Sequence, residues 1–458
     1  MADMSSQAIE PTLAAQAGVA GPPSAAEPQP GAAVRVPSMR FLVASLAGGN
    51  TLAMGLSMIA GVLSARLVAP STLGLLSGIG LVIAYAPFLQ LGIVTGINRE
   101  LPYFIGKRDY RRVNELAAAA QAWALVLAGV VCFGLLTAAG WELARGELKL
   151  AAGCLANAIL ALFLFYSTLY LQSTYRSSHD FARLAFVSVA QSIASLAFLV
   201  LVALWDFYGL CLRSVLAGAV GAALLHYWRP VRVGPHWNSG HLKHLLTIGL
   251  PIFAVNQFFL LWTPINSSLV LAYAGTEGLG LYAVVMMAGN ALDILPAALS
   301  QVVYPRMSEQ YGRTERLSDL IRMTWRPMAY ATAGMIPMIA VGEFLVGPFV
   351  QLVIPKYVGA LPAVRWIMLM PLLTCLGAMS MAFPVVRRQP LNGVAVVLGL
   401  ASYYGCLMWL LRGGVSLAAF AQAMLLGRVV YVILSSVFLT TLVRREKRDA
   451  GIPNASIP

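Results

Sequence analysis

Several ionisable side chains lie where a charge is costly, inside long apolar stretches of the sequence. Arg428 lies near the middle of residues 415–441, and Arg66, Arg213 and Arg365 lie near the ends of other apolar stretches. Charged residues in such surroundings are rare and mark functional sites. Because a planar guanidinium grips phosphate through two parallel hydrogen bonds, this set predicts a site for an anionic ligand.

Asp293 is the only acid deep inside an apolar stretch, three residues before Pro296. It is expected to pair with Arg428 or to bind a coupling ion, and pairing is the simpler reading because a lone buried charge is costly. The first six apolar stretches hold no carboxylate away from their ends. This cationic balance favours an anionic substrate over a cation.

Neutral polar side chains form a second group of candidates for substrate binding. Asparagine, glutamine and aromatic side chains bind sugar hydroxyls or stack on sugar rings, although helix packing and interfacial belts also use them. The candidates are Asn50, Asn256, Gln257, Asn266, Trp262, Tyr403 and Tyr404.

Residue types that hold metals or form disulfides lack the required spacing. His236, His241 and His244 have no acid or cysteine beside them in the sequence, and the five cysteines lie within apolar stretches. Structural zinc sites need closely spaced ligands, and an odd cysteine count leaves a disulfide framework incomplete. We therefore expect no metal, cofactor or catalytic residue.

The composition indicates that a lipid bilayer surrounds these side chains. Of 458 residues, 59% are hydrophobic and 11% are charged, and the mean hydropathy is +0.76. A soluble domain carries about a quarter charged residues. The net charge of +13 is spread over short gaps between apolar stretches, which predicts contact with anionic membrane lipids and not with nucleic acid.

Twelve apolar stretches are long enough to cross a bilayer as helices. The sequence thus predicts an all-α polytopic membrane protein. The stretches are 41–67, 73–97, 115–139, 150–173, 183–205, 208–228, 244–272, 279–303, 326–346, 360–385, 391–411 and 415–441.

The basic residues predict the orientation of these helices. Most of the 31 lysines and arginines lie on one side when both termini are placed in the cytoplasm, as the positive-inside rule requires. Residues 1–38 are rich in alanine, proline and glycine and lack the pattern of a signal peptide, so a disordered cytoplasmic tail is expected.

An internal repeat divides the chain into two halves. One constant offset aligns Leu73 with Leu279, and Lys107 with Arg313. Six spans per copy give two parallel repeats, an arrangement that predicts a central cavity between two lobes. The predicted parts are the tail 1–38, an N-terminal six-helix lobe 39–230, a C-terminal six-helix lobe 241–442 and a cytoplasmic tail 443–458.

Four segments together resemble a known transporter family. They are SARLVAPSTLGLLS from Ser64, GINRELPYFIGKRD from Gly96, TEGLGLYAVVMMAGNALDILPAALSQVVYPRMSEQYGR from Thr276 and IPKYVGALPAVRWIM from Ile354. The chain resembles the polysaccharide-exporter branch, with its Wzx-type flippases, of the multidrug/oligosaccharidyl-lipid/polysaccharide superfamily.

This resemblance implies alternating access to the central cavity by a transporter in the bacterial inner membrane. The implied substrate is an undecaprenyl-diphosphate-linked oligosaccharide, moved from the cytoplasmic to the periplasmic leaflet for O-antigen or exopolysaccharide synthesis. Polysaccharide polymerase and export machinery are the implied protein partners.

Two alternatives remain open at this stage. A drug or metabolite exporter has the same fold, and the missing acids of the first lobe argue against it. A membrane glycosyltransferase or polymerase needs catalytic acids, and Glu142 and Glu147 lie in one outer gap that is too short for a catalytic domain.

Overall fold

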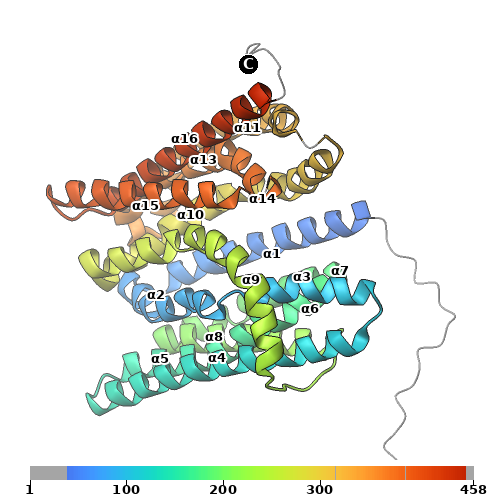
Figure 1. Cartoon of the computed structure of the whole chain (residues 1–458). Helices are drawn as coiled ribbons and strands as arrows, with labels where there is room; N and C mark the ends of the chain where they lie inside the picture. The colour runs from blue at the N-terminus through green and yellow to red at the C-terminus, as the bar shows by residue number, and fades with distance from the viewer. Residues whose placement is uncertain (1–38, 315, 387, 450–458) are drawn as a thin grey trace, which may run out of the picture. The chain divides into compact units, whose positions relative to one another are not determined.

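The computed structural model describes residues 39–314, 316–386 and 388–449, which are overwhelmingly helical (Figure 1). The chain from Arg40 onward forms one compact unit. The predicted tail 1–38 and the last residues of the predicted tail 443–458 lie outside the described part of the chain, whereas the final helix runs to Asp449.

The helices in the first part of the chain are joined by short turns. They are α1 (Met39–Leu67), α2 (Pro70–Tyr85), α3 (Ile93–Gly106), α4 (Tyr110–Ala144), α5 (Leu148–Phe165), α6 (Gln172–Ser177), α7 (Phe181–Ala197) and α8 (Leu199–Tyr227). A short 3-10 helix, η1 (Ala86–Gln90), continues α2, and a short π-helix, η2 (Tyr166–Leu171), continues α5.

The second part repeats this pattern after a loop that ends at α9 (Ser239–Leu260). The helices are α10 (Trp262–Thr314), α11 (Leu317–Val353), α12 (Leu361–Ile367), α13 (Met370–Gly377), α14 (Ala382–Val385), α15 (Gln389–Leu411) and α16 (Leu417–Asp449). The short turns η3 (Pro355–Ala360) and η4 (Ala378–Met381) precede α12 and α14.

Ten stretches of the described chain are helical, long and apolar enough to cross a membrane. Predicted spans 183–205 and 244–272 are not among these ten as single helices. The backbone is non-helical at Asp206 within α8 and at Gly275 within α10, so each label covers parts of two consecutive predicted spans. The predicted span 183–205 is therefore α7 with the start of α8, and 244–272 is α9 with the start of α10. The fold class is confirmed.

Local sequence explains where several helices begin. Asp109 caps α4 by accepting a hydrogen bond from the backbone N–H of Arg112 at 3.0 Å, and Asp180 does the same for Arg183 in α7 at 3.4 Å. An aspartate at this position satisfies an N–H group that the helix leaves unpaired. Pro70 opens α2, where its missing N–H costs nothing.

The two halves share nearly the same spacing of helix starts. Tyr110, which begins α4, corresponds to Leu317 at the start of α11, and Phe181 of α7 corresponds to Gln389 of α15. The separation in each pair is close to the separation of Leu73 and Leu279, so the repeat seen in the sequence is also present in the structure. Two parallel repeats of this kind are a common plan of membrane transporters.

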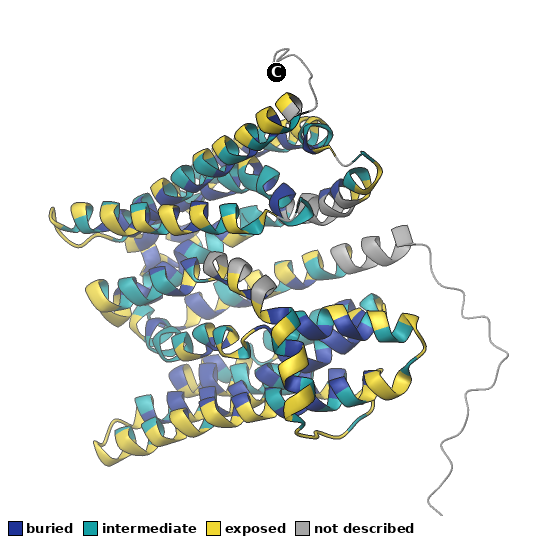
Figure 2. Ribbon diagram, viewed as in Figure 1, coloured by how far each residue is buried: buried dark blue, intermediate teal, exposed yellow. Residues whose placement is uncertain are grey.

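Each half has its own buried apolar core. One core joins residues between Ile83 and Leu245, and a second joins residues between Trp262 and Tyr431. Figure 1 shows α4 and α5 at one side and α15 and α16 at the other, with α1, α2 and α10 between them. Large apolar side chains also cover the exposed faces, as Phe133 and Phe344 illustrate, and Figure 2 shows these faces in yellow. Such faces suit lipid and not water.

Candidate functional site

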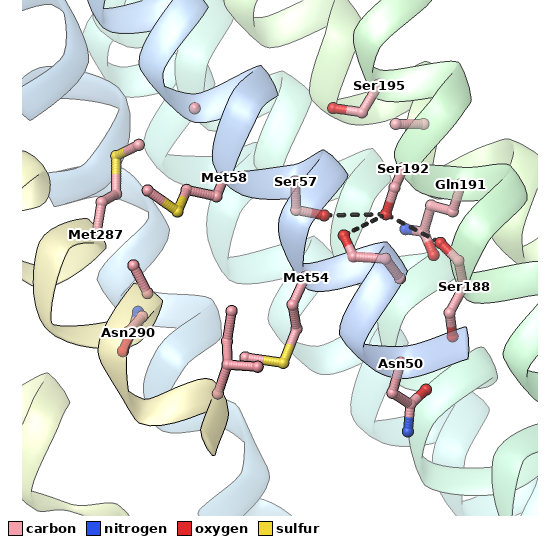
Figure 3. A pocket seen from close by; sticks show the side chains of 15 residues that line it. Asn50, Met54, Ser57, Met58, Ser188, Gln191, Ser192, Ser195, Met287 and Asn290 are labelled. Atoms are coloured by element: carbon pink, nitrogen blue, oxygen red, sulfur yellow. Dashed lines mark hydrogen bonds between the residues drawn. The ribbon is translucent and has the colours of Figure 1, made fainter. Parts of the chain in front are cut away.

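A cavity of about 700 Å³ lies where α1, α7 and α8 of the first half face α10 of the second half (Figure 3). It therefore lies between the two repeats, as the sequence predicts for a central cavity. Its lining residues are Asn50, Ala53, Met54, Ser57, Met58, Gly61, Ser188, Gln191, Ser192, Ser195, Ala217, Met287, Asn290, Ala291 and Ile294.

One wall of this cavity is a row of small polar side chains on α7. Ser188, Ser192 and Ser195 follow one another at helical spacing, and Gln191 lies beside them. The Ser192 hydroxyl lies 2.9 Å from Ser57 Oγ on α1, and it donates to the backbone carbonyl of Ala53 or of Ser188, 3.1 and 3.0 Å away. The Ser188 hydroxyl likewise donates to the backbone carbonyl of Leu184 at 3.0 Å, so Ser188 and Ser192 offer acceptor oxygens without a formal charge.

Among the described residues that line the cavity, every side chain is uncharged. Methionines on α1 and α10, Met54, Met58 and Met287, line the cavity on the side away from the serines of α7 (Figure 3). Methionine side chains are unbranched and adapt to ligands of irregular shape. The cavity thus combines one face rich in hydroxyl groups with one flexible apolar face.

Arg213 stands directly behind the serine wall. Its Nε donates a hydrogen bond to Ser195 Oγ at 3.2 Å, and its Nη1 donates to Ser64 Oγ on α1. The guanidinium therefore ties α8 to both α1 and α7, one hydroxyl away from the cavity. Its positive charge lies close enough to polarise the wall that Ser195 completes.

Arg428 lies in a second polar cluster, within the core of the second half. Its guanidinium carbon is 5.3 Å from the centre of the Trp262 ring, a cation–π distance. Asp293 and Tyr431 are within electrostatic reach of it. Asp293 lies on α10 between Asn290 and Ile294, both of which line the cavity, so the cluster adjoins the cavity through this helix.

The Asp293 carboxylate in this cluster has only part of its hydrogen-bonding capacity satisfied. Its carboxylate lies beside the Thr374 hydroxyl and within electrostatic reach of Arg428. One of its oxygens, Oδ1, is buried without a hydrogen-bond partner among the described residues. A buried carboxylate oxygen left in this way is costly.

The remaining predicted residues are placed less centrally. Arg66 is exposed at the end of α1, and Arg365 forms an ion pair of 3.6 Å with Glu343 in which both side chains are partly exposed. Asn266 accepts a hydrogen bond of 2.8 Å from the Tyr403 hydroxyl, and Gln257 is buried. The side chain of Asn256 lies outside the described part of the structure.

Two histidines that the sequence left without partners have carboxylates beside them in the fold. His244 Nε2 lies 3.0 Å from Glu100 on α3, and His241 Nε2 lies 3.6 Å from Glu115 on α4. The backbone of α9 also approaches the start of α3 closely, because a Cβ on Gly249 would collide with the backbone carbonyl of Gly92. Helix α9 therefore packs closely on the first half.

Asn50 was predicted from the sequence as a binding residue, whereas the serine wall was not. Serines at helical spacing along α7 are a detectable signal, yet small polar residues in membrane helices usually serve packing. Only the fold shows that this face of α7 looks into a cavity and not into a neighbouring helix.

Comparisons with known proteins support the fold and the family. A family model described as polysaccharide biosynthesis protein matches residues 62–356. No curated protein sequence matches the chain.

Solved structures share the fold at low sequence identity. An outward-facing multidrug resistance MATE family transporter of the MOP superfamily is 15% identical, with a TM-score of 0.65 over 89% of this chain and 96% of its own. An inward-facing form is 14% identical, with a TM-score of 0.70 over 89% and 99%. A MOP superfamily transporter from Pyrococcus furiosus, described as having a binding pocket of reverse polarity, is 14% identical, with a TM-score of 0.63 over 88% and 95%.

Proposed function

We propose that this chain, which belongs to the polysaccharide biosynthesis protein family and has the fold of MOP superfamily transporters, is a transporter that flips a lipid-linked oligosaccharide. The substrate would be an undecaprenyl-diphosphate-linked oligosaccharide that moves from the cytoplasmic to the periplasmic leaflet by alternating access. The product would serve synthesis of a cell-surface polysaccharide.

The observation that carries this proposal is the uncharged, hydroxyl-rich wall of the cavity. The hydroxyl oxygens of Ser57, Ser188 and Ser192 accept hydrogen bonds, and the Gln191 amide adds donors, so the wall matches the hydroxyl groups of a neutral sugar. A sugar bound there exchanges its hydrogen bonds with water for hydrogen bonds with the wall, which offsets the cost of leaving water. Asn50 on α1 extends the same chemistry along the cavity.

The positive charges nearby suit the diphosphate of such a substrate. Arg213 stands behind the wall and Arg428 lies in the adjoining cluster, so an anionic group in the cavity would be attracted from both sides. Charge–charge attraction is much stronger in an apolar interior than in water. Sugar and diphosphate would thus be held by different parts of one central region.

A drug exporter on the same fold is the alternative function. Exporters of cationic drugs need carboxylates on the cavity wall to attract their substrates. The described lining residues of this cavity include no carboxylate, and Asp293 lies beside the cavity within reach of Arg428. These observations favour the lipid-linked substrate.

We place this activity in the bacterial inner membrane with both termini in the cytoplasm. The support is the excess of lysine and arginine on one side of the predicted helices. Anionic lipids would contact these basic loops. Polysaccharide polymerase and export machinery would receive the flipped substrate.

Reconstitution into vesicles tests the proposal directly. Purified protein in proteoliposomes should move a labelled undecaprenyl-diphosphate oligosaccharide to the opposite leaflet, where an added glycosidase or lectin detects it. The double change Ser188→Ala with Gln191→Leu should lower this rate by about tenfold, the effect of losing one or two hydrogen bonds to the sugar. Ser402→Ala is the matched control, because this hydroxyl donates to the carbonyl of Leu398 within α15. Movement of cationic dyes, and not of the lipid-linked sugar, would overturn the proposal.

A further inference from the structure

Four polar side chains gather at one end of the first half. Tyr166 and Tyr170 lie on the π-helix η2, and His226 and Arg229 lie at the end of α8 and just after it. The Tyr166 hydroxyl is 2.8 Å from His226 Nδ1, and Arg229 Nη1 is 3.0 and 2.8 Å from the two ring nitrogens of His226. The described lining of the central cavity includes none of these residues. We refer to the four as the tyrosine–arginine cluster.

The wide turn of η2 brings two of these side chains together. A π-helix bonds residues five apart, so its turn is wider than that of an α-helix. Tyr166 and Tyr170 lie within this turn, and their ring centres are 5.8 Å apart. The hydroxyls of Ser167 and Thr168 both donate to the carbonyl of Leu164, at 3.1 and 2.6 Å, and support the start of the turn. Single π-turns inside α-helices occur frequently at functional sites.

The cluster holds more hydrogen-bond donors than acceptors. A guanidinium offers five N–H groups and no acceptor, and a neutral imidazole offers a single acceptor nitrogen. Arg229 and the Tyr166 hydroxyl both face the His226 ring, so they compete for that one acceptor. In the described part of the chain, no carboxylate forms an ion pair with Arg229. Its positive charge and several of its N–H groups therefore remain available to a ligand.

The Tyr170 hydroxyl is a second, independent indication of a ligand. The residue is 0% exposed, and its hydroxyl has no hydrogen-bond partner among the described residues. It lies within electrostatic reach of Tyr166 and Arg229, so it belongs to the same cluster. Buried polar groups are nearly always hydrogen-bonded, because leaving one unpaired is costly. An acceptor atom from outside the chain would supply its partner.

Aromatic side chains around the cluster indicate its depth in the membrane. Tyr227, next to His226 along the chain, is 73% exposed, and Trp228 packs edge-on against Phe186, which is 56% exposed. Tyrosine and tryptophan side chains concentrate at the membrane–water interface. The basic loops predict that this end of α8 faces the cytoplasm. The cluster is therefore expected at the level of the lipid phosphates of the cytoplasmic leaflet.

We propose that the tyrosine–arginine cluster binds the phosphate group of an anionic phospholipid. Phosphate oxygens accept several hydrogen bonds and carry the negative charge that no described carboxylate brings to Arg229. A guanidinium grips phosphate through two parallel N–H···O bonds, and the hydroxyls of Tyr166 and Tyr170 donate to the remaining oxygens. The interfacial aromatic side chains favour a phosphate carried by a lipid over free phosphate in solution. This inference does not depend on the proposed transport activity.

Lipid titration followed by native mass spectrometry tests this site. Phosphatidylglycerol added to the purified protein in detergent should bind about tenfold more tightly than phosphatidylcholine, whose choline cation offsets the phosphate charge. Arg229→Gln should weaken phosphatidylglycerol binding by about tenfold, because the charge-assisted hydrogen bonds are lost. Arg183→Gln is the matched control, since it removes a positive charge that already pairs with Asp180 at 3.0 Å. It should leave the lipid affinity unchanged.

Tyr170→Phe separates ligand binding from a structural role. The change removes only an unpaired buried hydroxyl, so without lipid the protein should unfold at the same temperature as the wild type or a higher one. Its affinity for phosphatidylglycerol should nevertheless fall by about threefold. Tyr175→Phe is the control, because this equally buried hydroxyl donates to the carbonyl of Leu225 at 2.8 Å. It should lower the unfolding temperature and leave the lipid affinity unchanged.

Unchanged lipid affinity in both Arg229→Gln and Tyr170→Phe would overturn the site. Equal losses in Arg229→Gln and Arg183→Gln would also overturn it, because they would show attraction to the basic loops as a whole. Displacement of the lipid by inorganic phosphate would assign the site to free phosphate instead. Stronger retention of undecaprenyl diphosphate than of phosphatidylglycerol would assign it to a polyprenyl lipid, which contradicts the proposal as well. If Arg229→Gln does not reach the membrane, Tyr170→Phe and its control decide the question.

Discussion

Gly74 on α2 and Gly280 on α10 meet backbone to backbone, and they occupy equivalent positions in the two repeats. A Cβ on Gly74 would collide with the carbonyl oxygen of Thr276, and a Cβ on Gly280 would collide with that of Pro70. Pro70 and Thr276 are themselves equivalent under the offset that relates the two glycines. The contact is thus reciprocal, as expected where two copies of one motif cross at a pseudo-twofold axis.

At this crossing, replacing glycine by alanine should lower the stability of the protein, whereas the same change usually raises the stability of a helix. Gly74→Ala and Gly280→Ala should each destabilise the protein by roughly 1–3 kcal/mol, because two backbones must separate to admit a methyl group. Alanine at an ordinary helical position is stabilising by about 1 kcal/mol relative to glycine. Thermal unfolding in detergent measures both effects.

Gly134→Ala on α4 is the control, since a Cβ there meets no atom within 4 Å. It should be neutral or stabilising. Unchanged unfolding temperatures for both crossing variants would contradict the close approach of α2 and α10.

Arg428 is the residue on which anion binding is most directly tested. If its guanidinium contacts the diphosphate, Arg428→Ala should lower translocation by at least about tenfold while the protein remains at normal levels in the membrane. Arg428→Lys should recover part of the activity, because the charge survives and the planar fork does not. The measurements are membrane abundance and vesicle translocation.

The neighbouring carboxylate supplies the competing outcome. If Arg428 serves only to neutralise Asp293, its removal leaves a buried charge uncompensated and destabilises the protein by roughly 3–5 kcal/mol. The double change Arg428→Ala with Asp293→Ala should then restore both abundance and transport. Full transport in the double variant would remove the binding role of Arg428.

Arg213 is expected to stabilise the cavity wall by holding α8 against α1 and α7. Removing it in Arg213→Ala leaves Ser64 and Ser195 without their shared donor and unties α8 from α1 and α7. The loss of two hydrogen bonds from a charged group should cost about 2–5 kcal/mol of stability. Thermal unfolding of Arg213→Ala and of Arg213→Lys, which retains the positive charge but not the planar fork, should give a graded series. Wild-type stability in both would show that these bonds do not support the wall.

The orientation in the membrane is open to a direct measurement. Reporter fusions after Arg108, Arg313 and Arg445 should report the cytoplasm, and fusions near Glu147 and Glu277 should report the periplasm. These positions flank predicted spans of both halves. A periplasmic signal at Arg313 would contradict the orientation of the second repeat.

The sequence predicted the helices and their repetition well because both depend on local patterns. Apolar stretches of sufficient length predict spans, and the matched starts of α4 and α11 or of α7 and α15 follow from the same repeat. The breaks at Asp206 and Gly275 fall at or near the ends of predicted spans, so the helix labels that cross them agree with the prediction as well.

The site was harder to predict because burial and direction depend on distant partners. Ser192 and Ser57 are far apart in the chain and become neighbours only through the packing of α7 on α1. The partners of Arg213, Ser64 and Ser195, belong to two other helices. No local pattern distinguishes a serine that faces a cavity from one that faces a helix.

The packing of α9 has a consequence for how the chain can be divided. Although α9 opens the second repeat, it packs on the first one through Gly249 and His244. Noncovalent contacts therefore hold the two halves together without the covalent link through the loop of residues 228–238. Separate polypeptides 1–234 and 235–458, made in the same cell, should reassemble into a working two-chain transporter without any covalent link between them.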